Sequence, residues 1–186
     1  MRIIAGTFRS RRLEAPRGTL TRPTLDPVRE AVFSALGGFF DGGSILDLYA
    51  GSGAIGLEAL SRGMARAVFC EKNRAAVIVL RHNIQALQVE ERTQVYPIAA
   101  DHALRQMQKN REQFDLVYLD PPYQLQENEK VMRDLEARNM LTANARVVVE
   151  AAREDRYAQR YGHLTLYKET RHGITRVLYY RREETI

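Results

Sequence analysis

Cysteine is nearly absent from this 186-residue chain, and the single copy, Cys70, cannot form an internal disulfide. No Cys/His cluster has the spacing of a zinc site, so we expect no metal. No apolar run reaches the roughly 18 residues of a membrane span. The start, MRIIAGTFRSRR, lacks the apolar stretch of a secretory signal. Internal repeats and low-complexity segments are also missing. These absences favour a cytoplasmic protein without membrane attachment.

Lysine is scarce as well, because 24 of the 28 basic residues are arginine. The formal net charge is +5 and the pI is about 9.5, which favours a polyanionic partner. A general preference for arginine in ion pairs is the other explanation of this bias. The clustering is more specific, since residues 1–30 hold seven arginines against three acids. We therefore predict a basic arm over residues 1–25 that contacts nucleic acid, ahead of one domain over 26–186. The candidate contacts here are Arg9, Arg11, Arg12 and Arg29.

Beyond the arm, short apolar strands alternate with helices, which is the pattern of a doubly wound α/β fold. Asp26-Pro27 is typical of a helix start, and Val28, Val32, Leu36 and Phe39 follow at helical spacing. The arm itself holds short β-like pieces at 2–5 and 11–13. Further strands are expected at 44–48, 67–70, 94–99, 114–119 and 146–149, with helices at 27–40, 54–61, 75–87, 102–109 and 130–138. Strands at 164–168 and 175–180 flank His172-Gly173 and predict a C-terminal hairpin.

Carboxylates stand at the ends of the five predicted parallel strands: Asp47, Glu71, Asp101, Asp120 and Glu150. In open α/β sheets, ligands bind beyond the carboxyl ends of the strands. We therefore expect these acids to line one edge.

The first strand leads into Gly51-Ser52-Gly53-Ala54-Ile55-Gly56, which matches the dinucleotide fingerprint G-x-G-x-x-G. Such a loop offers backbone N–H groups to an anion, either a pyrophosphate or a carboxylate. Asp47 argues against pyrophosphate, because its charge would lie close to the phosphates and a buried carboxylate is costly unless paired. S-adenosylmethionine (SAM) resolves the conflict, since it carries both a carboxylate and an ammonium group. Gly56 is then expected to serve helix packing without touching a ligand.

Two further acids fit a nucleoside cofactor. Glu71, at the end of the second strand, can accept hydrogen bonds from ribose hydroxyls. This role suits NAD and SAM equally. Asp101 can accept from an adenine amino group, although the N-cap of a helix is its ordinary alternative role.

The stretch Asp120-Pro121-Pro122-Tyr123 separates these cofactors. Two prolines after a buried strand fix a rigid loop whose carbonyls lack internal partners. An Asp oxygen and the Pro121 carbonyl can together accept both hydrogens of an exocyclic amine, while Tyr123 stacks on the base. This arrangement aims the amine lone pair at the methyl group, and Asp120 can take the proton. None of these features suits hydride transfer.

The chain resembles the RsmD family over nearly its whole length. The resemblance rests on three stretches in this order: DLYAGSGAIGLEALSRG, FCEKN and DPPY. It also rests on TRPT, Asp26 and VRE near the start. Members of that family are class I SAM-dependent methyltransferases that modify N2 of a guanine in 16S ribosomal RNA. The resemblance implies a Rossmann-like, seven-stranded, mostly parallel sheet with a C-terminal antiparallel hairpin, preceded by a short β-containing extension.

The resemblance also implies a set of site residues and a substrate. Its cofactor site corresponds to Asp47, Tyr49, Ala50, Gly51, Ser52, Gly53, Glu71, Lys72 and Asp101, and its amine-binding loop to Asp120, Pro121, Pro122 and Tyr123. Arg22 and Thr24 match a motif expected to fold over the cofactor or the base. The implied substrate is 16S rRNA within the small ribosomal subunit or an assembly intermediate. With no exposed apolar segment in evidence, we expect a monomer.

Three alternatives stay open at this point. An adenine-N6 DNA or RNA methyltransferase would use the same D-P-P-Y loop, although the chain has no room for a separate target-recognition region. An NAD-dependent oxidoreductase would use the glycine loop. An RNA-binding protein with an inactive site would need neither the glycine loop nor the D-P-P-Y loop.

Overall fold

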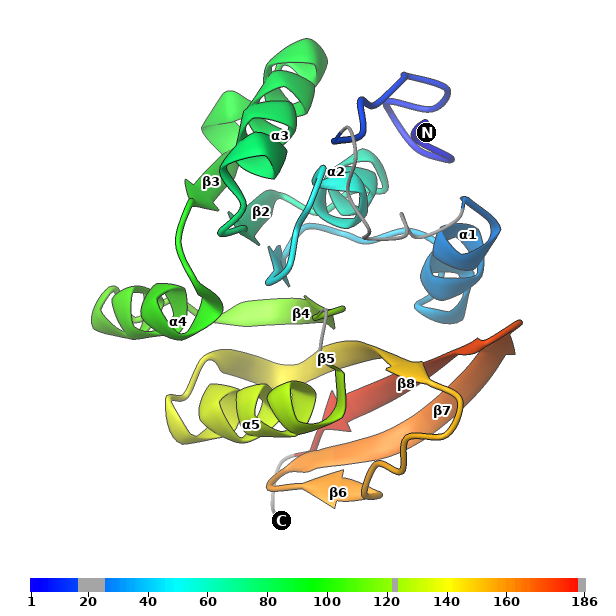
Figure 1. Cartoon of the computed structure of the whole chain (residues 1–186), viewed down its shortest axis with the longest axis vertical. Coiled ribbons are helices and arrows are strands. Elements are labelled where there is room, and N and C mark those ends of the chain that lie inside the picture. The colour runs from blue at the N-terminus through cyan, green and yellow to red at the C-terminus, as the bar shows by residue number, and fades with distance from the viewer. Residues whose placement is uncertain (17–25, 122–123, 184–186) are drawn as a thin grey trace. The chain divides into compact units, whose positions relative to one another are not determined.

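The computed structural model describes residues 1–16, 26–121 and 124–183, without the side chains of residues 124–126. The chain, drawn whole in Figure 1, divides into two compact units, Met1–Ala103 and Leu104–Ile186. No helix in the described ranges is long and apolar enough to cross a membrane. The same ranges contain no cluster of three or more His, Cys, Asp or Glu side chains that could hold a metal ion.

The first unit is built on three parallel strands in the order β3-β2-β1. They are short and mostly buried: β1 (Ser44–Asp47), β2 (Arg66–Cys70) and β3 (Thr93–Tyr96). The helices are α1 (Asp26–Ala35), α2 (Ala54–Ser61), α3 (Arg74–Leu87), the 3-10 turn η1 (Glu90–Arg92) and the beginning of α4 (Ala100–Lys109). Helix α2 is mostly apolar and packs against β1 and β2, and every residue in it is buried, including the polar Glu58 and Ser61.

Helix α1 is shorter than the sequence predicts. Its apolar spacing suggests an end near residue 40, but the helix ends at Ala35 because Gly37 and Gly38 adopt positive φ angles of 102° and 83°. The Gly38 N–H donates to the Phe33 carbonyl at 2.8 Å, which closes the end. Phe39 is consequently 63% exposed and does not belong to the buried stripe.

The second unit has the strand order β4-β5-β8-β7-β6. Strands β4 (Phe114–Leu119) and β5 (Leu141–Ala152) are parallel, whereas β8 (Thr175–Arg182), β7 (Leu164–His172) and β6 (Arg160–Tyr161) add antiparallel pairings. Helix α5 (Gln124–Ala137) packs against β5, as Figure 1 shows. The predicted hairpin is confirmed, since β7 and β8 are joined at Gly173, which has a φ of 61°.

The predicted α/β class, with parallel strands followed by an antiparallel C-terminal hairpin, is confirmed. The strand count differs, because the described residues contain eight strands and the prediction had seven. The additional strand is the two-residue β6, which is too short to leave a periodic pattern in the sequence.

Candidate cofactor site and basic arm

A glycine loop connects β1 to α2. Gly51 and Gly53 have φ angles of 53° and 81°, and the Gly53 N–H donates to the Ala50 carbonyl at 2.7 Å to close the turn. A Cβ on Gly53 would lie 2.3 Å from Cδ1 of Leu80, whereas one on Gly51 would meet no atom within 4 Å. Gly51 is therefore required for its backbone angle alone, and Gly53 for both its angle and its close approach to α3.

Asp47 caps the helix that follows this loop. Gly53 stands at the N-cap position without a side chain, and the Oδ2 of Asp47 accepts a hydrogen bond from the Gly56 N–H at 3.1 Å. The Asp47 side chain comes from the end of β1 and is only 2% exposed. A carboxylate at this position is stabilised by the positive end of the helix dipole. It also places one negative charge where a pyrophosphate would otherwise bind.

Gly56 is a packing position, as the sequence predicts. A Cβ built there would lie 2.3 Å from Cε1 of Phe69, a fully buried ring on β2. The third glycine of the fingerprint therefore lets α2 lie directly on the sheet. Its role as a close-packing position is confirmed.

Glu71, just after β2, accepts hydrogen bonds from the glycine loop and from the N-terminal end of α3. Its Oε2 accepts from the Gly51 N–H at 2.9 Å, and its Oε1 accepts from the Asn73 N–H at 2.7 Å. The glycine loop is thus held by carboxylates at two points, Asp47 through α2 and Glu71 directly. Each carboxylate oxygen of Glu71 keeps a second lone pair that can accept from a hydroxyl group.

The Cys70 thiol lies at the same edge of the sheet, at the end of β2. Burial and the nearby carboxylates of Glu71 and Asp47 raise the pKa of the Cys70 thiol to about 12. Its Sγ instead donates to the Ile98 carbonyl at 3.2 Å. The thiol therefore keeps its proton, and burial is the main cause.

The other residues of the predicted loop are also placed close to β2 and α3. The Ala50 N–H donates to the Cys70 carbonyl at 2.9 Å, and the Ser52 carbonyl accepts from the Asn83 side chain at 2.9 Å. Ala50 and Ser52 are buried, and Tyr49 is half-buried.

Lys72 and Asp101 complete the predicted cofactor set. Lys72 is exposed and directly follows Glu71 in the chain. Asp101 is half-buried in the first turn of α4, where the Ala99 carbonyl accepts the first helical hydrogen bonds. Ala99 therefore takes the N-cap position, so the alternative N-cap role of Asp101 is not observed.

The loop predicted to bind the amine begins in the second unit. Asp120 follows the buried end of β4 and is half-buried, while Pro121 is buried. The register pairs Leu119 with Val149, which brings Asp120 level with Glu150 at the same end of the two parallel strands. Glu150 is buried and accepts a short hydrogen bond from the Tyr118 hydroxyl. Pro122 and Tyr123, which complete the loop, lie outside the described residues.

The arm is an integral part of the first unit over residues 1–16. An antiparallel bridge joins Arg2 to Arg12, at the two places where short β-like pieces are predicted. Arg9, Arg11 and Arg12 are exposed, in agreement with a surface contact, and Arg11 Nη2 also donates to the Ala86 carbonyl of α3 at 2.5 Å. Arg22 and Thr24 lie outside the described residues.

Comparison with known proteins places this architecture in a family. Residues 1–181 match the family model described as conserved hypothetical protein 95. The chain belongs to this family.

Its relatives include the ribosomal RNA small subunit methyltransferase D of Haemophilus influenzae, 35% identical over 94% of this chain and 90% of the relative. The match confirms the predicted resemblance to the RsmD family.

Solved structures confirm the fold of this RsmD-family chain. The yhhF structure from Escherichia coli has a TM-score of 0.85 and 32% identity, and the match covers 98% of each chain. An RNA methyltransferase from Salinibacter ruber, solved with S-adenosyl-L-homocysteine, shares the fold at a TM-score of 0.66. Its identity is 20%, over 89% of this chain and 96% of that one.

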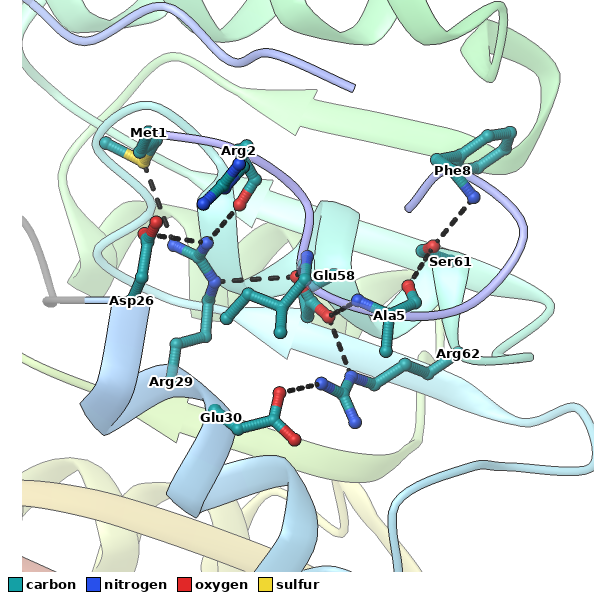
Figure 2. A network of polar contacts seen from close by, with 12 residues as sticks. Met1, Arg2, Ala5, Phe8, Asp26, Arg29, Glu30, Glu58, Ser61 and Arg62 are labelled. Carbon is teal, nitrogen blue, oxygen red and sulfur yellow. Dashed lines mark hydrogen bonds and ion pairs between the residues drawn. The ribbon is translucent and has the colours of Figure 1, made fainter. Parts of the chain in front are cut away.

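One arginine of the RsmD-like segment has a role that differs from the prediction. Arg29 was assigned to RNA contact, but its side chain is fully buried. It donates to the Arg2 carbonyl and to Asp26 at 3.1 Å, and its Nε lies 3.5 Å from a Glu58 oxygen (Figure 2). The assignment fails because the partner that buries Arg29 comes from a helix 29 residues away, which composition cannot reveal. Arg29 therefore stabilises the arm through its hydrogen bond to the Arg2 carbonyl.

Glu58 is the centre of this buried network, as Figure 2 shows. Its two carboxylate oxygens accept from the backbone N–H groups of Ile4 at 2.8 Å and Ala5 at 3.0 Å. Arg62, one turn further along α2, donates to Glu58 at 2.7 Å and to Glu30 at 2.8 Å. The carboxylate thereby joins the arm to α2, the helix that begins at the glycine loop, and it is fully buried.

Asn83 makes a second connection between the arm and the glycine loop. Its side chain accepts from the Glu14 N–H at 2.8 Å and donates to the Glu14 and Ser52 carbonyls at 3.0 and 2.9 Å. The signal that could have revealed Asn83 and Glu58 is a polar residue within an apolar helical stripe. Both side chains are almost fully buried and both satisfy backbone groups of the arm.

Proposed function

We propose that this chain transfers the methyl group of SAM to the exocyclic N2 of a guanine in 16S rRNA of the small ribosomal subunit. Two comparisons support the proposal. The Haemophilus influenzae relative is named as a ribosomal RNA small subunit methyltransferase, and the Salinibacter ruber structure of the same fold holds S-adenosyl-L-homocysteine, the demethylated form of SAM.

The observation that carries the proposal is the paired carboxylates around the glycine loop. Asp47 and Glu71 place two carboxylates beside the loop, and their charges add to the main effect of burial in raising the pKa of the Cys70 thiol to about 12. A pyrophosphate would be repelled there, whereas the ammonium and sulfonium groups of SAM would be attracted. The donor set therefore fits SAM better than a dinucleotide.

Each predicted residue then has a role toward the cofactor. Asp47 faces the ammonium group, Glu71 accepts from the ribose hydroxyls, and Asp101 accepts from the adenine amine. Tyr49, Lys72 and the 50–53 loop border the same ligand. SAM supplies a methyl group already activated on a sulfonium, so the protein need not activate the donor.

The nucleophile is prepared by the loop after β4. Asp120 and the Pro121 carbonyl accept the two hydrogens of the guanine amine, and Tyr123 stacks on the base. This arrangement concentrates the nitrogen lone pair and directs it at the methyl carbon. Asp120 receives the proton as the N–C bond forms and the C–S bond breaks. A guanine in a duplex would have to be flipped out to reach this loop.

The arm supplies the contact to the RNA backbone through Arg9, Arg11 and Arg12, whose side chains are exposed. Arg22 and Thr24 are proposed to cover the bound cofactor or base. The substrate is then the assembled small subunit or an assembly intermediate, because an arm of this kind needs an ordered RNA backbone to contact.

Calorimetry with SAM, S-adenosylhomocysteine and NAD tests the cofactor, and methyl transfer by the Asp120→Asn variant tests the catalytic loop. We expect micromolar binding of the first two ligands, no binding of NAD, and a variant that binds SAM normally but loses on the order of 100-fold or more in rate. Binding of NAD without SAM would refute the cofactor assignment. Full activity of Asp120→Asn would refute the role of Asp120 in proton transfer.

A further inference from the structure

A basic pocket lies on the first unit, beside the first turns of α3. Its volume is about 430 Å³, and it is lined by Lys72, Arg74, Val77, Ile78, Arg81 and Pro97. Apart from Lys72, none of these residues belongs to the predicted cofactor or RNA sites. The pocket combines three cationic side chains with an apolar surface.

The three cations have no partner in the part of the chain that the structure describes. No hydrogen bond, ion pair or ring contact involves the side chains of Lys72, Arg74 or Arg81 in residues 1–16, 26–121 and 124–183. Other arginines of this unit, such as Arg62 and Arg92, donate to several protein oxygens. The nearest acid in the chain, Glu71, accepts from the Gly51 and Asn73 N–H groups. The rim of the pocket therefore carries uncompensated positive charge.

The position of these cations on α3 is electrostatically unfavourable for the helix itself. The positive end of a helix dipole is stabilised by acids and destabilised by cations. Helix α3 has no acid in its first turn and no base in its last turn, and it begins with Arg74 directly after Lys72 and the N-cap Asn73. Here the positive end of the helix dipole and the positive side chains lie at the same end of α3. Their electrostatic potentials add, and together they attract an anion.

Ile78 provides the apolar part of the pocket. The residues of α3 that face the core are Ala76, Val77, Leu80, Asn83, Ile84 and Leu87. Ile78 lies outside this stripe and is 64% exposed, next to the exposed Pro97 on the pocket wall. An apolar surface rimmed by cations suits a nucleotide chain, whose phosphates meet the cations while a sugar or base face covers the aliphatic groups.

The same helix connects this pocket to the basic arm. Arg11 donates to the Ala86 carbonyl in the last turn of α3, and Glu14 is held by Asn83 in the turn before. Helix α3 has 14 residues and is therefore about 21 Å long. A carboxylate oxygen of Glu14 also lies 3.0 Å from Nδ1 of His82 in α3.

We propose that the pocket formed by Lys72, Arg74, Ile78 and Arg81 is a second RNA contact, which binds the phosphodiester backbone of the rRNA substrate. The proposal rests on the proposed function, since it takes the substrate to be rRNA. Lys72 then stands where the RNA contact borders the cofactor residue Glu71. The arm holds the RNA at one end of α3 and the pocket holds it at the other.

The double variant Arg74→Ala/Arg81→Ala tests this contact, and Lys72 is left in place because it belongs to the predicted cofactor set. Affinity for small ribosomal subunits is measured between 50 and 300 mM salt. Loss of two phosphate contacts lowers the slope of log K against log salt by about 1.4 and weakens binding roughly 25-fold at 0.1 M. SAM affinity by calorimetry should equal that of the wild type, which shows that the variant is folded and its cofactor site intact.

The charge-matched control is Arg105→Ala/Lys109→Ala, which removes two exposed cations from α4. We expect its slope to stay within about 0.5 of the wild type. An equal loss in both double variants would show a general charge effect and overturn the proposal. Wild-type affinity and slope in the Arg74→Ala/Arg81→Ala variant would also overturn it.

A photo-crosslinking amino acid at Ile78 identifies the class of macromolecule that occupies the pocket. We expect crosslinks to 16S rRNA when the protein is bound to small subunits. Crosslinks to a ribosomal protein alone, or none to RNA, would contradict an RNA contact. Failure of the proposed function is separate, because it would appear as absence of methyl transfer by the wild type, whatever the α3 variants do.

Discussion

Replacing Glu58 by glutamine should strongly destabilise this protein, because its carboxylate is fully buried among four donors. Glu58→Gln keeps the side-chain volume but replaces one acceptor oxygen with an NH2 donor. The native carboxylate is fully buried and receives the Ile4 and Ala5 N–H groups and the Arg62 guanidinium, with Arg29 at 3.5 Å. At least one of these donors would then face another donor.

The size of the effect follows from burial. Both Arg29 and Arg62 are 2% exposed or less, so the charge of Glu58 cannot be replaced by water. Removing one partner of a buried charged group costs about 3–5 kcal/mol, against a total stability of about 5–15 kcal/mol for a typical domain. The matched control is Glu30→Gln, which also removes an acid bonded to Arg62, at 2.8 Å. The Glu30 side chain is 47% exposed, so its loss should cost less than about 1 kcal/mol.

Urea unfolding followed by circular dichroism measures both variants, and amide hydrogen exchange at Ile4 and Ala5 reports the arm directly. We expect these two amides to lose protection in Glu58→Gln and to keep it in Glu30→Gln. A Glu58→Gln protein within about 1 kcal/mol of the wild type, with both amides still protected, would contradict the role of the buried carboxylate. It would show that the arm is held by contacts other than this carboxylate.

Three further outcomes are expected. Gly56→Ala should lower the free energy of unfolding by about 1–3 kcal/mol, because the new methyl group meets the Phe69 ring. Adding Phe69→Leu should recover part of this loss. Urea unfolding that shows no loss in Gly56→Ala would contradict the packing role. Asp47→Asn keeps an acceptor for the Gly56 N–H but removes the charge, so calorimetry should show SAM binding weakened about 10- to 100-fold. Unchanged SAM affinity would show that Asp47 does not bind the ammonium group. The pKa of Cys70 is raised to about 12, so the native protein holds a proton that the unfolded chain releases above pH 9. Stability from this thiol is therefore present below pH 9 and is lost as pH rises from 9 toward 12, by up to about 1.4 kcal/mol per pH unit. Unfolding of Cys70→Ala between pH 8 and 10.5 should show a shallower decline than the wild type, and parallel curves would be the contrary result.

Elements with strong local signals were predictable from the sequence. Helix α2 and strand β4 have the predicted bounds, because a glycine loop precedes the helix and the strand is apolar except for Asp115. Helix α5 begins at Gln124, six residues before the predicted start, since the segment QLQENE carries few apolar residues to reveal a period. Strand β5 begins at Leu141, ahead of the predicted start at residue 146. Asn144 lies between these two positions, and its positive φ of 62° interrupts the regular strand pattern.

The candidate site was predictable where residue type alone indicates chemistry, as for Asp47 and Glu71 beside the glycine loop. The exposed arginines of the arm agree with their predicted position as well. What could not be predicted is non-local pairing. Arg29 resembles its neighbouring arginines in the sequence, and only the approach of Glu58 from α2 makes it a buried structural residue.

Methyl transfer to N2 of a guanine in 16S rRNA is the reaction that we propose for this chain. The most direct measurement uses labelled SAM and small ribosomal subunits from a strain that lacks the gene, followed by digestion and identification of the modified nucleoside. We expect label in N2-methylguanosine from 16S rRNA, with no transfer by Asp120→Ala. Label in N6-methyladenosine, or no label in RNA at all, would contradict it.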